Sequence, residues 1–175
     1  PQIDSLSLEE QPLNTFVSEE IYYLAQFWAT DLVGSGDAYW IKASKNGVPL
    51  NKPSEISLAF DSGFTQGGNF DGVTFIQPIR QSINPFDTDS NDNFLSPYLP
   101  GDSVFVEIHS ISEKAFQFLN EVKVATDRPG GFAELFAQPL SNVPTNIKNT
   151  NAAIEGDVLG YFNVAAVSGL GKRFE

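Results

Sequence analysis

Residues 103–122 read SVFVEIHSISEKAFQFLNEV, and this stretch decides the fold class. Its first part, residues 103–109, alternates apolar with other residues, as a strand with one covered face does. The apolar members of that face are Val104, Val106 and Ile108. Ser110 and Glu113 follow at the spacing of a capping box, in which two side chains satisfy unpaired N–H groups at a helix start. The stretch therefore predicts a strand that leads directly into a helix.

The predicted helix begins between Ser110 and Ser112 and ends between Val124 and Asp127. Residues 127–131 (DRPGG) supply its stop signal, because proline and two glycines do not continue a helix. Four apolar residues fall at helical spacing and form a stripe for the core: Ala115, Phe118, Leu119 and Val122.

Strand patterns occur on both sides of this unit. Residues 21–30 (IYYLAQFWAT) are apolar on both faces and predict a central strand. Residues 38–44 run into Asn46-Gly47, a dipeptide that favours a tight hairpin. The other strand patterns are Leu6/Leu8, Ile56/Leu58/Phe60, Val73/Phe75 and residues 159–167. About seven strands and one helix predict a mostly β fold, an antiparallel β-sandwich or open β-barrel, in one domain over residues 1–175.

Composition narrows the function classes. The formal net charge of −12 argues against binding to nucleic acid or to an anionic lipid surface, since both need clustered Lys and Arg. The chain has no Cys, which excludes disulfides and thiolate sites, and no Met, so we expect a segment upstream of Pro1. No apolar run approaches the ~20 residues of a spanning helix, which leaves any membrane attachment to that upstream segment. The charge also favours a monomer.

The strongest candidate metal loop is residues 87–93 (DTDSNDN), where Asp87, Asp89 and Asn91 place oxygens at alternate positions, as Ca²⁺ requires. An EF-hand loop has Gly at its sixth position and Glu at its twelfth, whereas this chain has Asp92 and Tyr98. We therefore predict a solvated acidic turn, no metal and no other cofactor.

Catalytic candidates are few. His109 is the only histidine, and strand alternation places it on the face opposite Val104, where a surface or helix-capping role is favoured. Four carboxylates stand at predicted strand ends: Asp31, Asp37, Asp61 and Asp71. Turn chemistry is the favoured reason for their positions, and a glycosidase-like pair is the alternative that the sequence leaves open.

Aromatic residues are the candidate ligand-binding residues. Trp28, Tyr39 and Trp40, with Tyr22 and Tyr23, have the flat surfaces that a carbohydrate-stacking platform needs. Core packing is the competing and favoured interpretation in a chain with 15 Phe.

Several segments together resemble a family of Bacteroidetes lipoproteins called domain of unknown function 4249. Residues 1–6 (PQIDSL) resemble the junction between the family's N-terminal β-domain and its second domain. Residues 31–40 (DLVGSGDAYW) resemble its DP-x-G-x-x-N-Y-Y stretch, with the Pro and Asn replaced. The other matching segments are residues 101–119, 142–147 (NVPTNI), 156–162 (GDVLGYF) and 165–168 (AAVS).

The resemblance implies the second domain of an exported lipoprotein, anchored in the outer membrane through a lipidated Cys outside this chain. Such proteins are commonly encoded beside TonB-dependent outer-membrane transporters, which implies an uptake accessory that binds a glycan or other nutrient. The family supplies no catalytic residues. We therefore expect a non-enzymatic binding or assembly module, with a glycan-acting hydrolase and a Ca²⁺-stiffened spacer as alternatives.

Overall fold

The computed structural model describes residues 1–12, 21–61, 72–74, 80, 82–85, 96–128, 130–137, 143–151, 153, 156 and 158–175. The predicted metal loop, Asp71, Phe75 and most of the polar stretches at residues 63–72 and 84–101 fall outside these residues, so the predictions about them are not tested.

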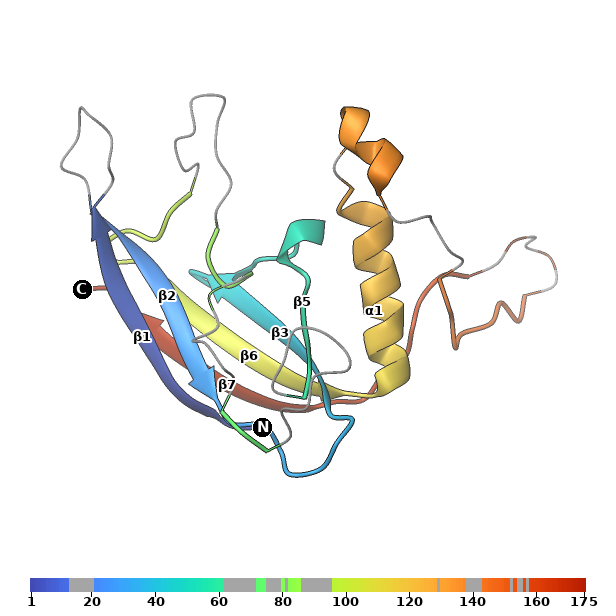
Figure 1. Cartoon of the computed structure of the whole chain (residues 1–175), viewed down its shortest axis with the longest axis horizontal. Helices are drawn as coiled ribbons and strands as arrows, with labels where there is room; N and C mark the ends of the chain where they lie inside the picture. Colours follow the sequence, from blue (N-terminus) through green and yellow to red (C-terminus); the bar gives the residue numbers. More distant parts are fainter. Residues whose placement is uncertain are drawn as a thin grey trace.

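The described residues form seven strands and one α-helix in two antiparallel sheets (Figure 1). A two-stranded sheet pairs β1 (Ile3–Pro12) with β2 (Ile21–Ala29). The second sheet is built on β3 (Ala38–Lys45), with β6 (Ser103–Ile111) on one edge and β4 (Val48–Pro49) and β5 (Ser57–Phe60) on the other. The outermost strand, β7 (Ala166–Arg173), pairs with β6. The prediction of a mostly β, sandwich-like fold is confirmed, and the described strands do not close into a barrel.

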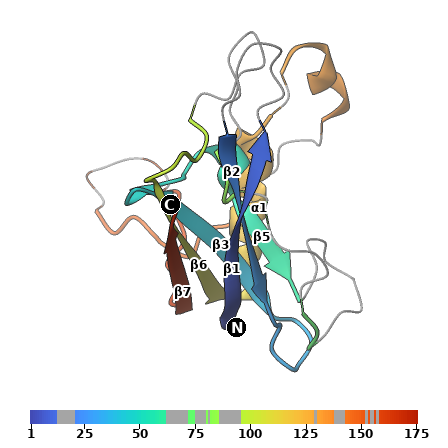
Figure 2. The same ribbon diagram turned by 90° about the vertical axis from the view of Figure 1, so that its left-hand side faces the viewer.

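The two sides of the five-stranded sheet carry different partners. The β1–β2 hairpin covers one side, here called the inner face, and α1 (Glu113–Thr126) covers part of the other, the outer face (Figure 1). Figure 2 looks from the hairpin side and shows α1 behind the sheet. Two short 3-10 turns complete the elements, η1 (Pro53–Glu55) and η2 (Gly131–Phe136). No described helix has the length and apolar character to cross a membrane.

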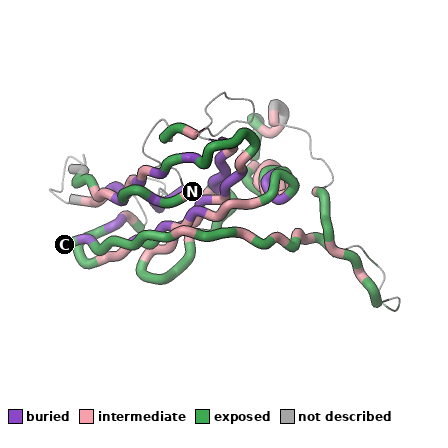
Figure 3. The backbone as a smooth tube through the Cα atoms, turned by 90° about the horizontal axis from the view of Figure 1, so that it is seen from below, coloured by how far each residue is buried: buried purple, intermediate pink, exposed green. Residues whose placement is uncertain are grey.

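The main core lies between the hairpin and the inner face (Figure 3). Strand alternation directs one residue in two to this layer, and the buried residues of β2, β3 and β6 in it include Ala25, Phe27, Tyr39, Ile41, Ala43, Val104, Val106 and Ile108. Burial of each large side chain contributes about 1.5–3 kcal/mol. Phe174 closes one end by stacking on Tyr98, with ring centroids 4.8 Å apart.

A smaller core fixes α1 on the outer face. Ala38, Leu58 and Phe116 are buried there, and the Phe60 and Phe116 rings meet edge to face at 5.7 Å. The predicted helix is confirmed, but Ser112, not Ser110, is its N-cap: the Ser112 hydroxyl accepts a hydrogen bond from the Ala115 N–H. Ser110 remains in β6, because its backbone pairs with Ala166 of β7 and Tyr39 of β3.

The hairpin predicted at Asn46-Gly47 is confirmed, with both residues at positive φ (51° and 78°), as a tight turn between β3 and β4 requires. Two strand predictions are wrong. Among the described strands β2 pairs with β1 alone and is not central; its further contacts are single bridges, from Tyr23 to Tyr98 and, just past its end, from Thr30 to Thr74. Its free edge is instead occupied by a side chain: the Asn84 amide both accepts from and donates to the Ala25 backbone, each at 2.8 Å.

The other error concerns the strand predicted over residues 159–167. The observed strand begins at Ala166, and residues 158–165 belong to no strand. Side chains satisfy the backbone of this segment. Thr145 donates to the Gly160 carbonyl at 2.6 Å, and Asn146 bonds both the N–H and the carbonyl of Phe162 at 2.7 Å. With these groups already paired, the segment is held in place without a neighbouring strand.

Candidate functional site

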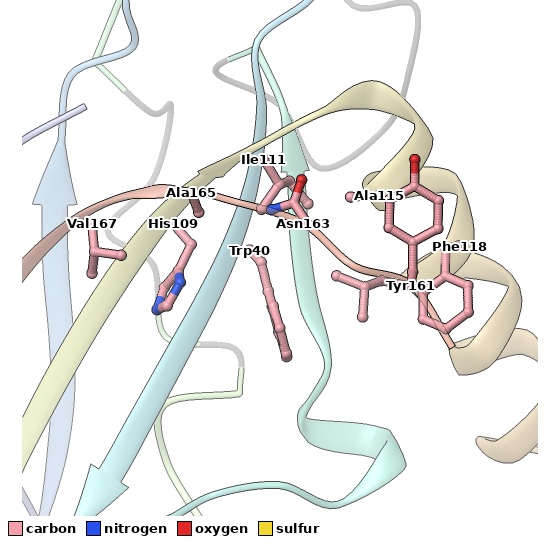
Figure 4. A pocket seen from close by; sticks show the side chains of 10 residues that line it. Trp40, His109, Ile111, Ala115, Phe118, Tyr161, Asn163, Ala165 and Val167 are labelled. Carbon is pink, nitrogen blue, oxygen red and sulfur yellow. The ribbon is translucent and has the colours of Figure 1, made fainter. Parts of the chain in front are cut away.

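A pocket of about 400 Å³ lies on the outer face of the sheet, between α1 and the segment that leads into β7 (Figure 4). The sheet contributes Trp40, His109 and Ile111, and α1 contributes Ala115, Phe118 and Leu119. The remaining lining residues come from the C-terminal part of the chain: Tyr161, Asn163, Ala165 and Val167. Pockets of this size with mostly apolar walls and a few polar groups are typical of small-molecule sites.

The Trp40–His109 pair forms the sheet side of the pocket. The two residues are direct cross-strand partners on β3 and β6, so strand pairing brings their rings to 6.0 Å between centroids, with 46° between planes. On the same face, the Lys42 ammonium lies 4.8 Å from the centroid of the Trp40 ring, which is the geometry of a cation–π contact. The pairing of β3 with β6 thus places Trp40 beside His109, although the two residues are far apart in the sequence.

The prediction that His109 lies on the face opposite Val104 is confirmed, since His109 pairs with outward-facing Trp40 while Val104 is in the core. The His109 Nε2 atom is buried and makes no hydrogen bond within the part of the chain that the structure describes. The nearest charged group is the Glu107 carboxylate, whose Oε2 is 3.6 Å away. This nitrogen is therefore shielded from solvent by neighbouring side chains.

The opposite wall is aromatic as well. The Phe118 and Tyr161 rings lie with centroids 5.4 Å apart and 35° between planes. Asn163 holds this wall to the helix start, because its Oδ1 accepts from the Ser112 N–H at 3.5 Å and from the Ser112 hydroxyl at 3.3 Å. A backbone N–H only donates, so the atom that faces it is the amide oxygen, and Nδ2 has no hydrogen-bond partner within the described residues.

The three predicted ligand-binding aromatics do not come together. Trp40 lines the pocket, whereas Tyr39 is completely buried on the inner face and Trp28 lies on β2 of the other sheet. The Tyr39 hydroxyl donates to Asp31 Oδ1 at 2.6 Å. Burial, together with this hydrogen bond to a carboxylate, raises the pKa of Tyr39 far above its ordinary value.

Two of the described carboxylates at strand ends, Asp31 and Asp61, bind the backbone. Asp61 Oδ1 accepts from the N–H groups of Gly36 (2.7 Å) and Asp37 (3.0 Å), and Asp31 Oδ2 accepts from the Gly72 N–H at 3.3 Å. These bonds are the turn chemistry that the sequence favours for Asp31 and Asp61. Within the described residues, no group of three or more His, Cys, Asp or Glu side chains is placed to hold a metal ion.

The sequence alone did not identify the wall of the pocket that is formed by Phe118, Tyr161 and Asn163. It assigned Phe118 to the core stripe and Tyr161 to a strand, and it gave Asn163 no role. The available signal was the pattern Tyr161-Phe162-Asn163, in which alternate residues must face the same side of an extended segment. That pattern does not reveal which element lies opposite.

The family model described as Domain of unknown function (DUF4249) matches residues 2–169. No curated protein and no solved structure matches the chain.

Proposed function

We propose that this chain, which belongs to the DUF4249 family, is a non-enzymatic binding module of an exported lipoprotein. In this proposal a lipidated cysteine upstream of Pro1 anchors the protein in the outer membrane. The domain then acts as a monomer beside a TonB-dependent transporter and holds a glycan unit or another small nutrient.

The observation that carries the proposal is the Trp40 pocket. It combines a concave shape, a volume of about 400 Å³ and aromatic side chains from three separate parts of the chain. Trp40 is only partly buried, and a ligand that covers the rest of its ring gains the free energy of burying that apolar area. The pocket is held by strand pairing and by the Ser112–Asn163 hydrogen bonds, so little ordering is required when a ligand enters.

The chemistry of the lining supports binding in place of catalysis. The described lining contains no Ser, Thr, Asp or Glu, and the neighbouring Glu107 carboxylate, 3.6 Å from His109 Nε2, lies beyond hydrogen-bond distance. A nucleophile or acid–base pair needs a partner within that distance. Asp31 and Asp61, two of the strand-end carboxylates that the hydrolase alternative would use, bind loop backbone.

Exposed apolar residues near the pocket support an assembly role. Leu159, Phe162 and Val164 are 74%, 71% and 80% exposed and follow one another along residues 158–165. Large apolar side chains that gather on a surface are typical of contact sites for other proteins. A transporter that covers this segment would lie next to the pocket, because Tyr161 and Asn163 line it from the same segment.

The chain offers a direct test of binding, since its two tryptophans are Trp28 and Trp40. A Trp28→Phe variant has Trp40 as its sole indole reporter, and a Trp40→Phe variant has only Trp28. We expect a glycan and nutrient library to give a saturable fluorescence change in the first variant and none in the second. The absence of any saturable change at millimolar concentrations would contradict the proposal.

The same incubations test the hydrolase alternative. Mass spectrometry of the mixtures should show every library member unchanged, because the proposal assigns no reaction to the pocket. Cleaved glycans that disappear with Asp31→Asn or Asp61→Asn, each shown to be folded by circular dichroism, would favour the enzyme. The lipid anchor is tested separately by palmitate labelling and membrane fractionation of the full-length precursor.

A further inference from the structure

We infer that the Trp40 pocket takes a flat aromatic or heteroaromatic molecule that carries a hydrogen-bond acceptor, in preference to a sugar. This inference rests on the proposed function, because it names the ligand class of the same pocket.

The walls favour a flat ring. Figure 4 shows Trp40 with its ring edge-on, His109 on one side of it and the Phe118–Tyr161 pair on the other. Aromatic side chains thus approach the cavity from the sheet and from the helix side. Offset-stacked and edge-to-face contacts between rings add to the free energy of area burial, and a flat guest makes such contacts with both walls.

The polar groups are too few for a sugar. Four residues of the described lining carry polar side-chain atoms, namely Trp40, His109, Tyr161 and Asn163, and the indole N–H of Trp40 can only donate. The His109 Nε2 is buried, and the Asn163 Oδ1 is already used by Ser112. A buried sugar hydroxyl without a partner lowers affinity by about ten-fold or more, and a pyranose would bury several of them.

One polar group has a fixed direction. Because Ser112 holds the amide oxygen of Asn163, the pocket is offered the Nδ2 donor and not the acceptor. A carbonyl, ring nitrogen or carboxylate on the guest would accept from it. This selects guests with an acceptor over plain hydrocarbon rings of the same size.

The experiment uses calorimetry and ¹H–¹⁵N NMR with four probes: indole-3-carboxamide, 3-methylindole, cyclohexanecarboxamide and methyl glucopyranoside. We expect indole-3-carboxamide to bind best, with about ten-fold weaker binding of both 3-methylindole, which lacks the acceptor, and cyclohexanecarboxamide, which lacks the flat ring. Chemical-shift changes should centre on Trp40, Phe118 and Asn163.

Asn163→Asp is the matched variant, because it keeps the oxygen that Ser112 needs and removes the Nδ2 donor. It should weaken indole-3-carboxamide about ten-fold more than it weakens 3-methylindole. Trp40→Leu should abolish binding of both indoles, and Trp28→Leu should not.

The possible outcomes separate the two claims. Tighter binding of methyl glucopyranoside in this pocket would overturn the aromatic class and leave the proposed function standing. Equal effects of Trp28→Leu and Trp40→Leu would overturn the assignment of the site. If none of the four probes and no member of the wider library shifts resonances at Trp40, the ligand class and the proposed function both fail.

Discussion

The hydroxyl of Tyr39 donates a 2.6 Å hydrogen bond to the buried carboxylate of Asp31 on the inner side of the sheet, directly behind the pocket residue Trp40. Consecutive strand residues point to opposite faces, so one dipeptide supplies both a buried polar contact and a pocket wall. We predict that Tyr39→Phe lowers the free energy of unfolding by about 1–3 kcal/mol, because Asp31 loses a hydrogen-bond donor inside the protein.

Urea denaturation measures this change. Tyr161→Phe is the control, since the Tyr161 hydroxyl has no partner within the described residues, and its effect should stay within about 0.5 kcal/mol. Equal destabilisation by the two variants would show that the Asp31 bond contributes nothing specific.

The helix cap gives the second prediction. Ser112→Ala removes the acceptor for the Ala115 N–H and the donor to Asn163, so it should cost about 0.5–2 kcal/mol. Ser110→Ala, at the cap that the sequence predicts, should cost less, because Ser110 lies in β6. Thermal unfolding of the two variants in parallel decides between the two positions, and a larger loss at Ser110 would contradict the observed cap.

The third prediction concerns Asn84, whose amide bonds the Ala25 N–H, the Ala25 carbonyl and the Arg80 carbonyl at 2.8–2.9 Å. Asn84→Ala should cost about 2–4 kcal/mol, since it leaves buried backbone groups of β2 without partners. Asn151→Ala removes an exposed local bond and should cost under about 0.5 kcal/mol. Chemical denaturation with matched spectroscopic probes compares them, and similar values would refute the role given to Asn84.

The fourth prediction concerns acid stability. Burial raises the pKa of Asp102, but hydrogen bonds from the Leu99 N–H, Asn46 and Lys45 outweigh it and hold the pKa below its ordinary value. Because the folded-state pKa is depressed, the Asp102 carboxylate stabilises the fold fully at pH values above the unfolded-state pKa of about 4. This contribution is lost as the pH falls through the folded-state pKa.

Unfolding free energies of the native chain and Asp102→Asn should therefore differ by a constant amount between about pH 5 and pH 7 and converge below about pH 4. Asp127→Asn, at the exposed end of α1, is the control. A difference between the native chain and Asp102→Asn that persists unchanged to the lowest pH at which both fold would contradict this account.

Local sequence patterns predicted most elements. Alternation identified β1, β3, β5 and β6, the Asn46-Gly47 turn identified the hairpin, and helical spacing identified α1 to within a few residues. The cap was misplaced because Ser110 and Ser112 both precede a run of helix-forming residues, and only the pairing of Ser110 within the sheet excludes it from the helix. The strand predicted at residues 159–167 failed for a related reason. Its apolar content is strand-like, but side chains from Thr145 and Asn146 occupy its backbone groups.

The sequence by itself determined the fold class, the family and the face on which His109 lies, because these follow from interactions between near neighbours and from recognisable segments. Only the tertiary structure decided that Trp40, Phe118, Tyr161 and Asn163 share one cavity while Trp28 and Tyr39 do not. A pocket forms where segments distant in the chain meet, and that meeting depends on strand order, helix placement and long-range hydrogen bonds. The residues of a segment favour its local conformation, but they do not by themselves determine which other segment packs against it.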